Sequence, residues 1–168
     1  PLGERPWYGE ARTEVNTVAQ GAAELLRAAK EHPPLIDARA HPYGTLTPRN
    51  YMNESEQARY RYGAYTAGVA RLYAWRLPLL LNVHATFMEE TQMTRGHAPW
   101  FAPFLRAGEH YLPVRDGFGD LAQRIEAANA APDATHRVHL AGRRFASRVL
   151  LSEECVYGVM RLYLRELA

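Results

Sequence analysis

The feature that most constrains the fold of this chain is the alternation of short apolar stretches with longer segments of helical periodicity. Four stretches are apolar, aromatic or alternating enough to form strands: residues 35–37, 60–65, 83–88 and 110–114. Apolar residues at helical spacing occupy residues 15–29 and 71–81, and Pro33 and Pro34 end the first of these helices. This alternation predicts a three-layer α/β domain with a largely parallel sheet.

The last third of the chain carries three helical stripes. Apolar residues recur every three to four positions over residues 118–128, 138–149 and 156–167. Ser152 stands just before the third stripe, where its hydroxyl can accept an early backbone N–H as an N-cap. We therefore expect the domain to finish with helices.

Length, charge and cysteine content narrow the class of protein. The 168 residues suit a single domain, and 20 basic against 18 acidic residues give no excess that would favour a nucleic acid or an anionic membrane. Cys155 is the sole cysteine, which excludes an intramolecular disulfide and a zinc site built on several cysteines. No stretch approaches the roughly 20 apolar residues of a membrane span.

Three weaker motifs have structural interpretations. His136 and His139 are three residues apart on a predicted helix, and solvated surface residues are favoured over metal ligands. Cys155 follows two glutamates that oppose thiolate formation, so packing is favoured over nucleophilic chemistry. The glycines of residues 117–119 lack the third glycine of a dinucleotide fingerprint and indicate a turn before a helix.

Arginines and glycines near the predicted ends of elements are the candidate binding residues. Arg12 and Thr13 are expected to follow a short strand and open a helix, where amides and a guanidinium hold an anion such as a diphosphate. Gly68 lies between a strand and a helix, with Arg71 and Arg76 beyond it, at the carboxyl ends of strands where open α/β sheets bind ligands. Ordinary surface charge explains the same spacing equally well.

From about Tyr60 onward the chain resembles glycosyltransferase family 90, which contains capsule-associated fungal xylosyltransferases and eukaryotic protein O-glucosyltransferases. Residues 105–114 resemble the family's Leu-Lys-Pro-Trp stretch leading into His-Tyr-Ile/Val-Pro-Val, and residues 142–146 its Gly-Gln-x-Phe-Ala helix. Residues 60–62 with Gly68 are similar to its Tyr-Lys-Tyr strand and glycine. The remaining similar segments are residues 7–13, 75–77 and 164–168.

The resemblance implies a GT-B architecture of two Rossmann-like lobes, of which residues 1–168 would be the C-terminal lobe that binds a UDP-sugar. It assigns six residues to the nucleotide-sugar site: Gly9, Arg12, Thr13, Gly68, Arg71 and Arg76. The two glycines would let the backbone approach the ligand. The guanidinium groups would stabilise the departing diphosphate, and no metal or other cofactor is expected.

The resulting expectation is a glycosyltransferase that moves glucose or xylose from a UDP-sugar to a protein or glycan hydroxyl. The catalytic base is expected in a missing N-terminal lobe of the same chain, so no catalytic residue is assigned. No nucleic-acid partner is expected, and the location would be the endoplasmic reticulum or Golgi lumen for a eukaryotic source and the cytoplasm for a bacterial one. Tyr8, Ala67 and Pro99 depart from the family pattern and motivate the alternative, a non-catalytic, degenerate α/β module that binds a protein or glycan.

Overall fold

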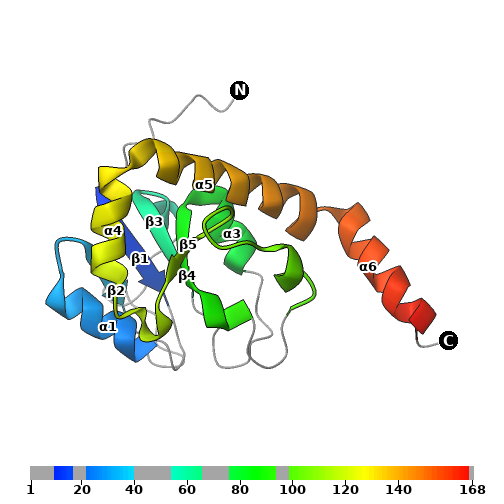
Figure 1. Cartoon of the computed structure of the whole chain (residues 1–168), viewed down its shortest axis with the longest axis horizontal. Coiled ribbons are helices and arrows are strands. Elements are labelled where there is room, and N and C mark those ends of the chain that lie inside the picture. The colour runs from blue at the N-terminus through cyan, green and yellow to red at the C-terminus, as the bar shows by residue number, and fades with distance from the viewer. Residues whose placement is uncertain (1–9, 17–21, 40–53, 66–75, 94–98, 167–168) are drawn as a thin grey trace.

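The described part of the chain forms an α/β domain around one parallel sheet. A computed structural model describes residues 10–16, 22–39, 54–65, 76–93 and 99–166. Within these ranges five strands pair in parallel in the order β2-β1-β3-β4-β5 (Figure 1). The strands are β1 (Glu10–Asn16), β2 (Ile36–Arg39), β3 (Tyr60–Tyr65), β4 (Ala85–Glu89) and β5 (Leu112–Val114). The predicted parallel sheet is confirmed.

Helices connect the strands and complete the domain. The α-helices are α1 (Ala22–Glu31), α2 (Glu54–Gln57), α3 (Arg76–Val83), α4 (Leu121–Ala130), α5 (Pro132–Phe145) and α6 (Glu153–Glu166). The shorter helical turns are η1 (Glu90–Met93), η2 (Ala102–Phe104), η3 (Asp116–Phe118) and the π-helical η4 (Ala146–Leu150). The three predicted C-terminal helices are confirmed, and Ser152 caps α6 by accepting the N–H of Cys155 at 3.3 Å.

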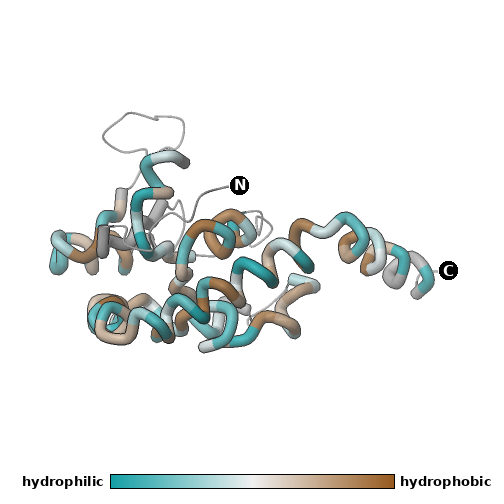
Figure 2. Tube along the Cα trace, turned by 90° about the horizontal axis from the view of Figure 1, so that it is seen from above, coloured by the Kyte–Doolittle hydropathy of each residue, from teal (hydrophilic) through white to brown (hydrophobic). Residues whose placement is uncertain are grey.

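Both faces of the sheet are buried, which gives the three predicted layers. Alternate strand residues belong to different cores: Tyr62 and Phe87 pack with α1 and α4, whereas Tyr65 and Met88 pack with α3 and the end of α5. The rings of Tyr62 and Phe87 meet edge to face, with centroids 5.4 Å apart. Figure 2 shows hydrophobic and hydrophilic residues alternating along α5, as expected for a helix with one face on a core.

One predicted boundary differs from the structure near the start of the chain. Val15, the first residue of the predicted helix over residues 15–29, lies in β1, and α1 is described from Ala22. Of the predicted helix over residues 71–81, residues 76–81 lie in α3 and residues 71–75 lie outside the described residues. Pro113 lies in the middle of β5, which is an edge strand and so tolerates a proline.

Close backbone approach at two glycines lets α3 and α5 cover their face of the sheet. A Cβ on Gly63 of β3 would lie 3.0 Å from Leu80 and 3.2 Å from His84, at the inner side of α3. A Cβ on Gly142 of α5 would overlap the carbonyl oxygen of His110. Residues 105–114 and residues 142–146, two segments singled out in the sequence, are therefore in direct contact at Gly142.

The side chain of His84, the residue before β4, connects the start of β4 to the start of β3. Its side chain is 3% exposed, and its Nδ1 donates to the carbonyl oxygen of Tyr60 at 2.9 Å. Burial lowers the pKa of His84 from 6.5 to about 4, although the hydrogen bond to Tyr60 opposes this change. His139 of α5 is also buried and hydrogen-bonds the backbone of His84, and burial lowers its pKa too. The expectation that His139 is a solvated surface residue is wrong, because α5 packs this side chain against α3 and β4.

We expect Gly142→Ala to lower the free energy of unfolding by about 3 kcal/mol, because the added methyl group must displace the backbone of His110. Urea denaturation measures this loss. Gly158→Ala is the matched control: nothing lies within 4 Å of a Cβ there, so the substitution should stabilise α6 by up to about 1 kcal/mol. Equal effects of the two variants would contradict the close contact of α5 with residue 110.

The stability of the domain should fall as the pH drops from 6.5 toward 4. In this window the unfolded chain protonates His84 while the folded chain does not, so protons favour unfolding. His84→Asn keeps an N–H donor for Tyr60 and removes the titration, and it should flatten this part of the pH profile. Urea unfolding across the window measures the slope, with exposed His32→Asn as control. An unchanged slope in His84→Asn would contradict the assignment.

Candidate functional site

The carboxyl edge of the sheet is the candidate site, because in open parallel sheets the strand ends and the following helix starts converge there. Within the described residues, β3 ends at Tyr65, β4 at Glu89 and β5 at Val114, and α3 begins at Arg76. Tyr65 pairs with Met88, and Glu89 with Val114, so the three strand ends lie level with one another. The edge therefore brings together residues separated by about fifty positions in the sequence.

Arg76 supplies positive charge at this edge. It is the first residue of α3, is half-buried, and lies on the same helical face as Leu80 and His84, which contact the sheet at Gly63. A half-buried guanidinium can bind an anion with directed donors, and the anion-binding role of Arg76 stays a prediction.

A hydrogen-bonded turn follows β5 at the same edge. The backbone N–H of Gly117 donates to Glu89 Oε1 at 2.5 Å, and the hydroxyl of Thr91 donates to Asp116. Gly117 has φ +72°, and Phe118, which is buried, has φ +54°. These contacts fix η3 to the end of β4 and confirm the turn predicted from the glycines of residues 117–119.

Asp120 anchors the other side of this turn. Its Oδ1 accepts the backbone N–H of Arg115 at 2.8 Å, and its Oδ2 accepts from the Arg124 guanidinium at 3.0 Å. Burial raises the pKa of Asp120, but the hydrogen bonds from Arg115 and Arg124 and their positive charges outweigh it, so the pKa lies below its usual 3.8. No role for Asp120 or Glu89 was predicted from the sequence, because the partners of both carboxylates are set by the folding of the turn.

The first helix also reaches the turn. A Cβ on Gly117 would lie 3.5 Å from the Cγ of Glu24, which is in the first turn of α1. The described edge is thus basic at Arg76 and carries carboxylates at η3 and α1. A ligand with an anionic group and several hydroxyls would find complementary groups along it.

The structure describes three of the six predicted site residues. Arg76 is the first described residue of α3, and its role in the site stays a prediction, whereas Gly9, Gly68 and Arg71 lie outside the described residues. Arg12 and Thr13 do not open a helix: they lie inside β1, where Thr13 is paired with Ile36 on one side and Tyr62 on the other. Since a central strand engages its amides in the sheet ladder, the predicted helix N-terminus at Arg12 and Thr13 is wrong.

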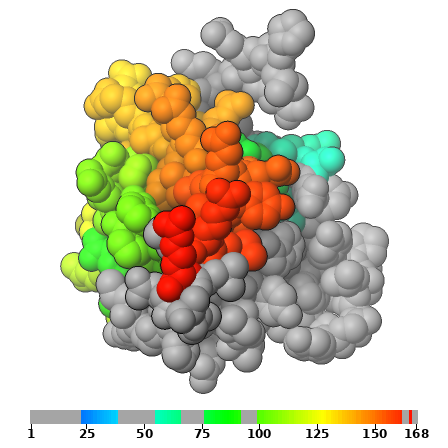
Figure 3. Space-filling model, turned by 90° about the vertical axis from the view of Figure 1, so that its right-hand side faces the viewer, coloured from blue at the N-terminus to red at the C-terminus, as the bar shows by residue number. Residues whose placement is uncertain are grey.

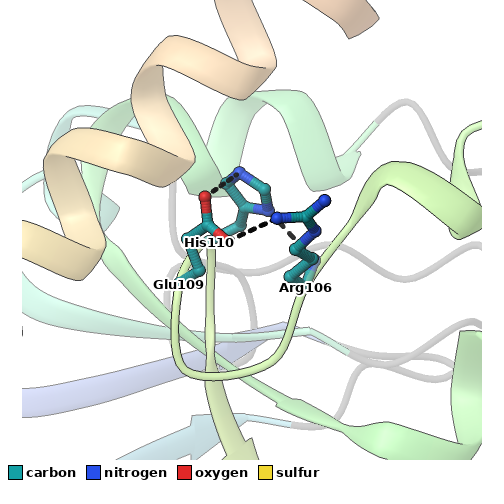
Figure 4. A network of polar contacts seen from close by, with 3 residues as sticks. All are labelled: Arg106, Glu109 and His110. Atoms are coloured by element: carbon teal, nitrogen blue, oxygen red, sulfur yellow. Dashed lines mark hydrogen bonds and ion pairs between the residues drawn. The ribbon is translucent and has the colours of Figure 1, made fainter.

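A separate polar network precedes β5 (Figure 4). His110 Nδ1 accepts the backbone N–H of Arg106 at 3.0 Å, and its Nε2 lies 3.6 Å from Glu109, whose other oxygen is 3.4 Å from the Arg106 guanidinium. The His110 ring lies 4.9 Å from that of Phe145. Burial lowers the pKa of His110, which keeps Nδ1 available as an acceptor. Because this network lies at the opposite end of β5 and contacts α5, we assign it to holding the loop in place.

Two further properties of the described residues bear on the kind of site. No group of three or more His, Cys, Asp or Glu side chains there is placed to hold a metal ion. None of the described helices is long and apolar enough to cross a membrane.

Comparison with known proteins gives a matching family and a similar viral protein. The sequence model of the family described as "Glycosyl transferase family 90" matches residues 12–168. The chain is also 31% identical over 87 residues to "Uncharacterized protein 035R" of Invertebrate iridescent virus 3. That match covers 52% of this chain and 8% of the viral protein, so the chain spans less than a tenth of that relative.

Asp120→Asn should lower the free energy of unfolding by about 2 kcal/mol at neutral pH, because the carboxylate that holds Arg115 and Arg124 loses its charge. The carboxylate's contribution is present above pH 3.8 and is lost as the pH falls through its lower folded pKa, so the two proteins should converge in acid. Urea unfolding at neutral and acidic pH checks this, with exposed Glu126→Gln on α4 as control. A difference that stays constant with pH would contradict it.

Proposed function

The chain belongs to glycosyltransferase family 90, and from this membership we propose that it is the donor-binding lobe of a glycosyltransferase. The lobe would bind a UDP-sugar, and the enzyme would transfer glucose or xylose to a hydroxyl of a protein or glycan. The observation that carries the proposal is the coincidence of the family match with the parallel sheet. Apart from the first two residues of β1, residues 12–168 include all of the described strands and the carboxyl edge at which such sheets bind ligands.

Arg76 is the residue we assign to the diphosphate. A nucleotide-sugar carries its negative charge on the diphosphate, and that charge increases on the leaving group as the sugar departs. Arg76 lies in α3, which connects β3 to β4, and its half-buried guanidinium would meet this charge with directed donors. Arg71, which follows the same strand in sequence, is the second candidate for this role.

The carboxylates on the edge suit the neutral part of the donor. Ribose and hexose hydroxyls donate hydrogen bonds, and Glu24 and Glu89 offer carboxylate oxygens near the η3 turn. We propose that this end of the edge faces the sugar or ribose, while Arg76 faces the diphosphate. The donor would then lie along the strand ends without a metal ion.

Catalysis would require a second lobe. Within the GT-B arrangement proposed here, that lobe precedes this one in the same chain and supplies the acceptor site and the base. The matched part of the viral relative is likewise a small fraction of a much longer protein. We therefore assign donor binding, and no catalytic base, to this lobe.

The proposal is tested by titrating the chain with UDP in a calorimeter, with GDP and ADP as controls. Selective binding of UDP is expected. A folded domain that binds none of the three nucleotides would contradict donor binding by this lobe and favour the non-catalytic module.

Arg76→Ala should weaken UDP binding at least tenfold, which corresponds to about 1.4 kcal/mol, while the domain stays folded at the temperature of the titration. Arg144→Ala, an exposed arginine on α5, is the matched control and should bind UDP as the parent does. Unchanged affinity in Arg76→Ala would remove Arg76 from the site and transfer its role to Arg71.

A further inference from the structure

Strand β3 carries three tyrosines, and two of them have hydroxyl partners within the fold. The hydroxyl of Tyr60 donates to Asp37 Oδ2 at 2.6 Å, and that of Tyr62 donates to Asn129 Oδ1 at 2.8 Å. The hydroxyl of Tyr65 makes no hydrogen bond with any of the described residues. Because buried tyrosine hydroxyls usually have a partner, the third hydroxyl calls for an explanation.

The ring of Tyr65 is held in an apolar cluster. Tyr65 is 3% exposed and shares this cluster with Leu77 of α3 and Met88 of β4. Phe145 and Ala146, at the junction of α5 and η4, belong to it as well, and Figure 3 shows these two helices at the surface of the molecule. Burial raises the pKa of Tyr65 to about 12, so its hydroxyl keeps its proton and can donate.

The hydroxyl oxygen of Tyr65 can be reached from the surface. Among the described side chains, Tyr65 does not supply one of the polar atoms that are both wholly buried and without a partner. The small exposed part of the residue therefore includes its oxygen. Tyr65 thus offers a hydrogen-bond donor that a bound molecule can use.

The sheet topology places the end of β3 where open α/β sheets bind ligands. The chain runs from β1 to β2 on one side of β1 and then crosses to β3 on the other side. Such sheets bind ligands beyond the carboxyl ends of the strands where the strand order reverses, which here is between β1 and β3. Glu14 pairs with Gly63, and each strand ends two residues later, at Asn16 and Tyr65. Tyr65 is therefore level with the end of β1, on a strand that borders the reversal.

The two faces of the sheet present different groups near the strand ends. Glu89 continues the alternation of β4 onto the face covered by α1, where Glu24 also lies beside the η3 turn. Tyr65 lies on the opposite face, in the same cluster as Leu77, the neighbour of Arg76 in α3. Carboxylates accept hydrogen bonds from hydroxyls, whereas a tyrosine hydroxyl and a guanidinium donate them. The α3 face therefore suits the acceptor oxygens of a diphosphate.

We propose that Tyr65 is a further binding residue of the donor site, where its hydroxyl donates a hydrogen bond to a phosphoryl oxygen of the diphosphate. This contact rests on the proposed function, because its ligand is the UDP-sugar assigned there. A charged phosphoryl oxygen accepts the bond that no described side chain accepts. The contact adds a neutral donor on a fixed ring to the positive charge of Arg76.

Tyr65→Phe tests the contact because it removes the hydroxyl and keeps the ring. In a calorimeter it should weaken UDP binding about tenfold, since a hydrogen bond to a charged oxygen is lost. In the absence of nucleotide, the midpoint of urea unfolding should stay the same or rise, because the substitution removes a buried hydroxyl that has no described partner.

Tyr62→Phe is the matched control on the same strand. The Tyr62 hydroxyl bonds Asn129 within the fold, so its removal should lower the urea midpoint and leave the affinity for UDP unchanged. A midpoint that falls as far in Tyr65→Phe as in Tyr62→Phe would show that the Tyr65 hydroxyl has a structural partner, and would overturn the proposal.

Uridine, which has no phosphate groups, identifies the part of the ligand that Tyr65 contacts. In an amide chemical-shift titration, Tyr65→Phe should bind uridine as the parent does. An equal loss of affinity for uridine and for UDP would overturn the contact with the diphosphate.

Failure of this contact can be told apart from failure of the proposed function. If the parent binds UDP and Tyr65→Phe binds it equally well, Tyr65 is not in the site and donor binding stands. If the folded parent binds neither UDP nor uridine, the donor site and the Tyr65 contact are both overturned.

Discussion

An all-parallel sheet must be covered on both faces, and in this protein one of those faces can be covered only by close contact between backbones. Gly63 allows α3 to lie against β3, and Gly142 allows α5 to lie against the carbonyl of His110. These contacts position α3, and therefore Arg76 at its first residue. The position of the candidate anion site therefore depends on two glycines, Gly63 and Gly142.

Side chains that hold the fold together lie toward one end of the strands, and the candidate binding side chains lie toward the other. His84, His139 and the network of Arg106, Glu109 and His110 lie toward the amino ends of β4 and β5, where burial lowers the pKa of each histidine. Arg76 and the η3 turn lie toward the carboxyl ends. Substitutions in the first group, and of Asp120 beside the η3 turn, are therefore expected to alter stability, whereas substitution of Arg76 is expected to alter ligand binding.

Much of the fold was predictable because its signals are local. The aromatic alternation of residues 60–65 and the stripes of the last third each reflect one element packed on a core, and both predictions are confirmed. A short strand was expected before Arg12, but Arg12, Thr13 and Val15 were assigned to the start of a helix, whereas they lie in β1, which pairs on both sides. Arg76 was singled out because it follows Gly68, which was expected between a strand and a helix, and because of the family resemblance; its role stays a prediction. Glu89 was not singled out, since its partner Gly117 is 28 residues away and the contact exists only after folding.

The central claim is that this lobe binds a uridine nucleotide at the carboxyl edge of its sheet. Amide chemical-shift mapping during a titration with UDP tests it most directly, because it locates the ligand residue by residue. We predict that the shifted amides include Arg76 and those at the carboxyl ends of β3, β4 and β5. Shifts centred instead on His110 and Gly142, or no shifts in a folded domain, would contradict the account.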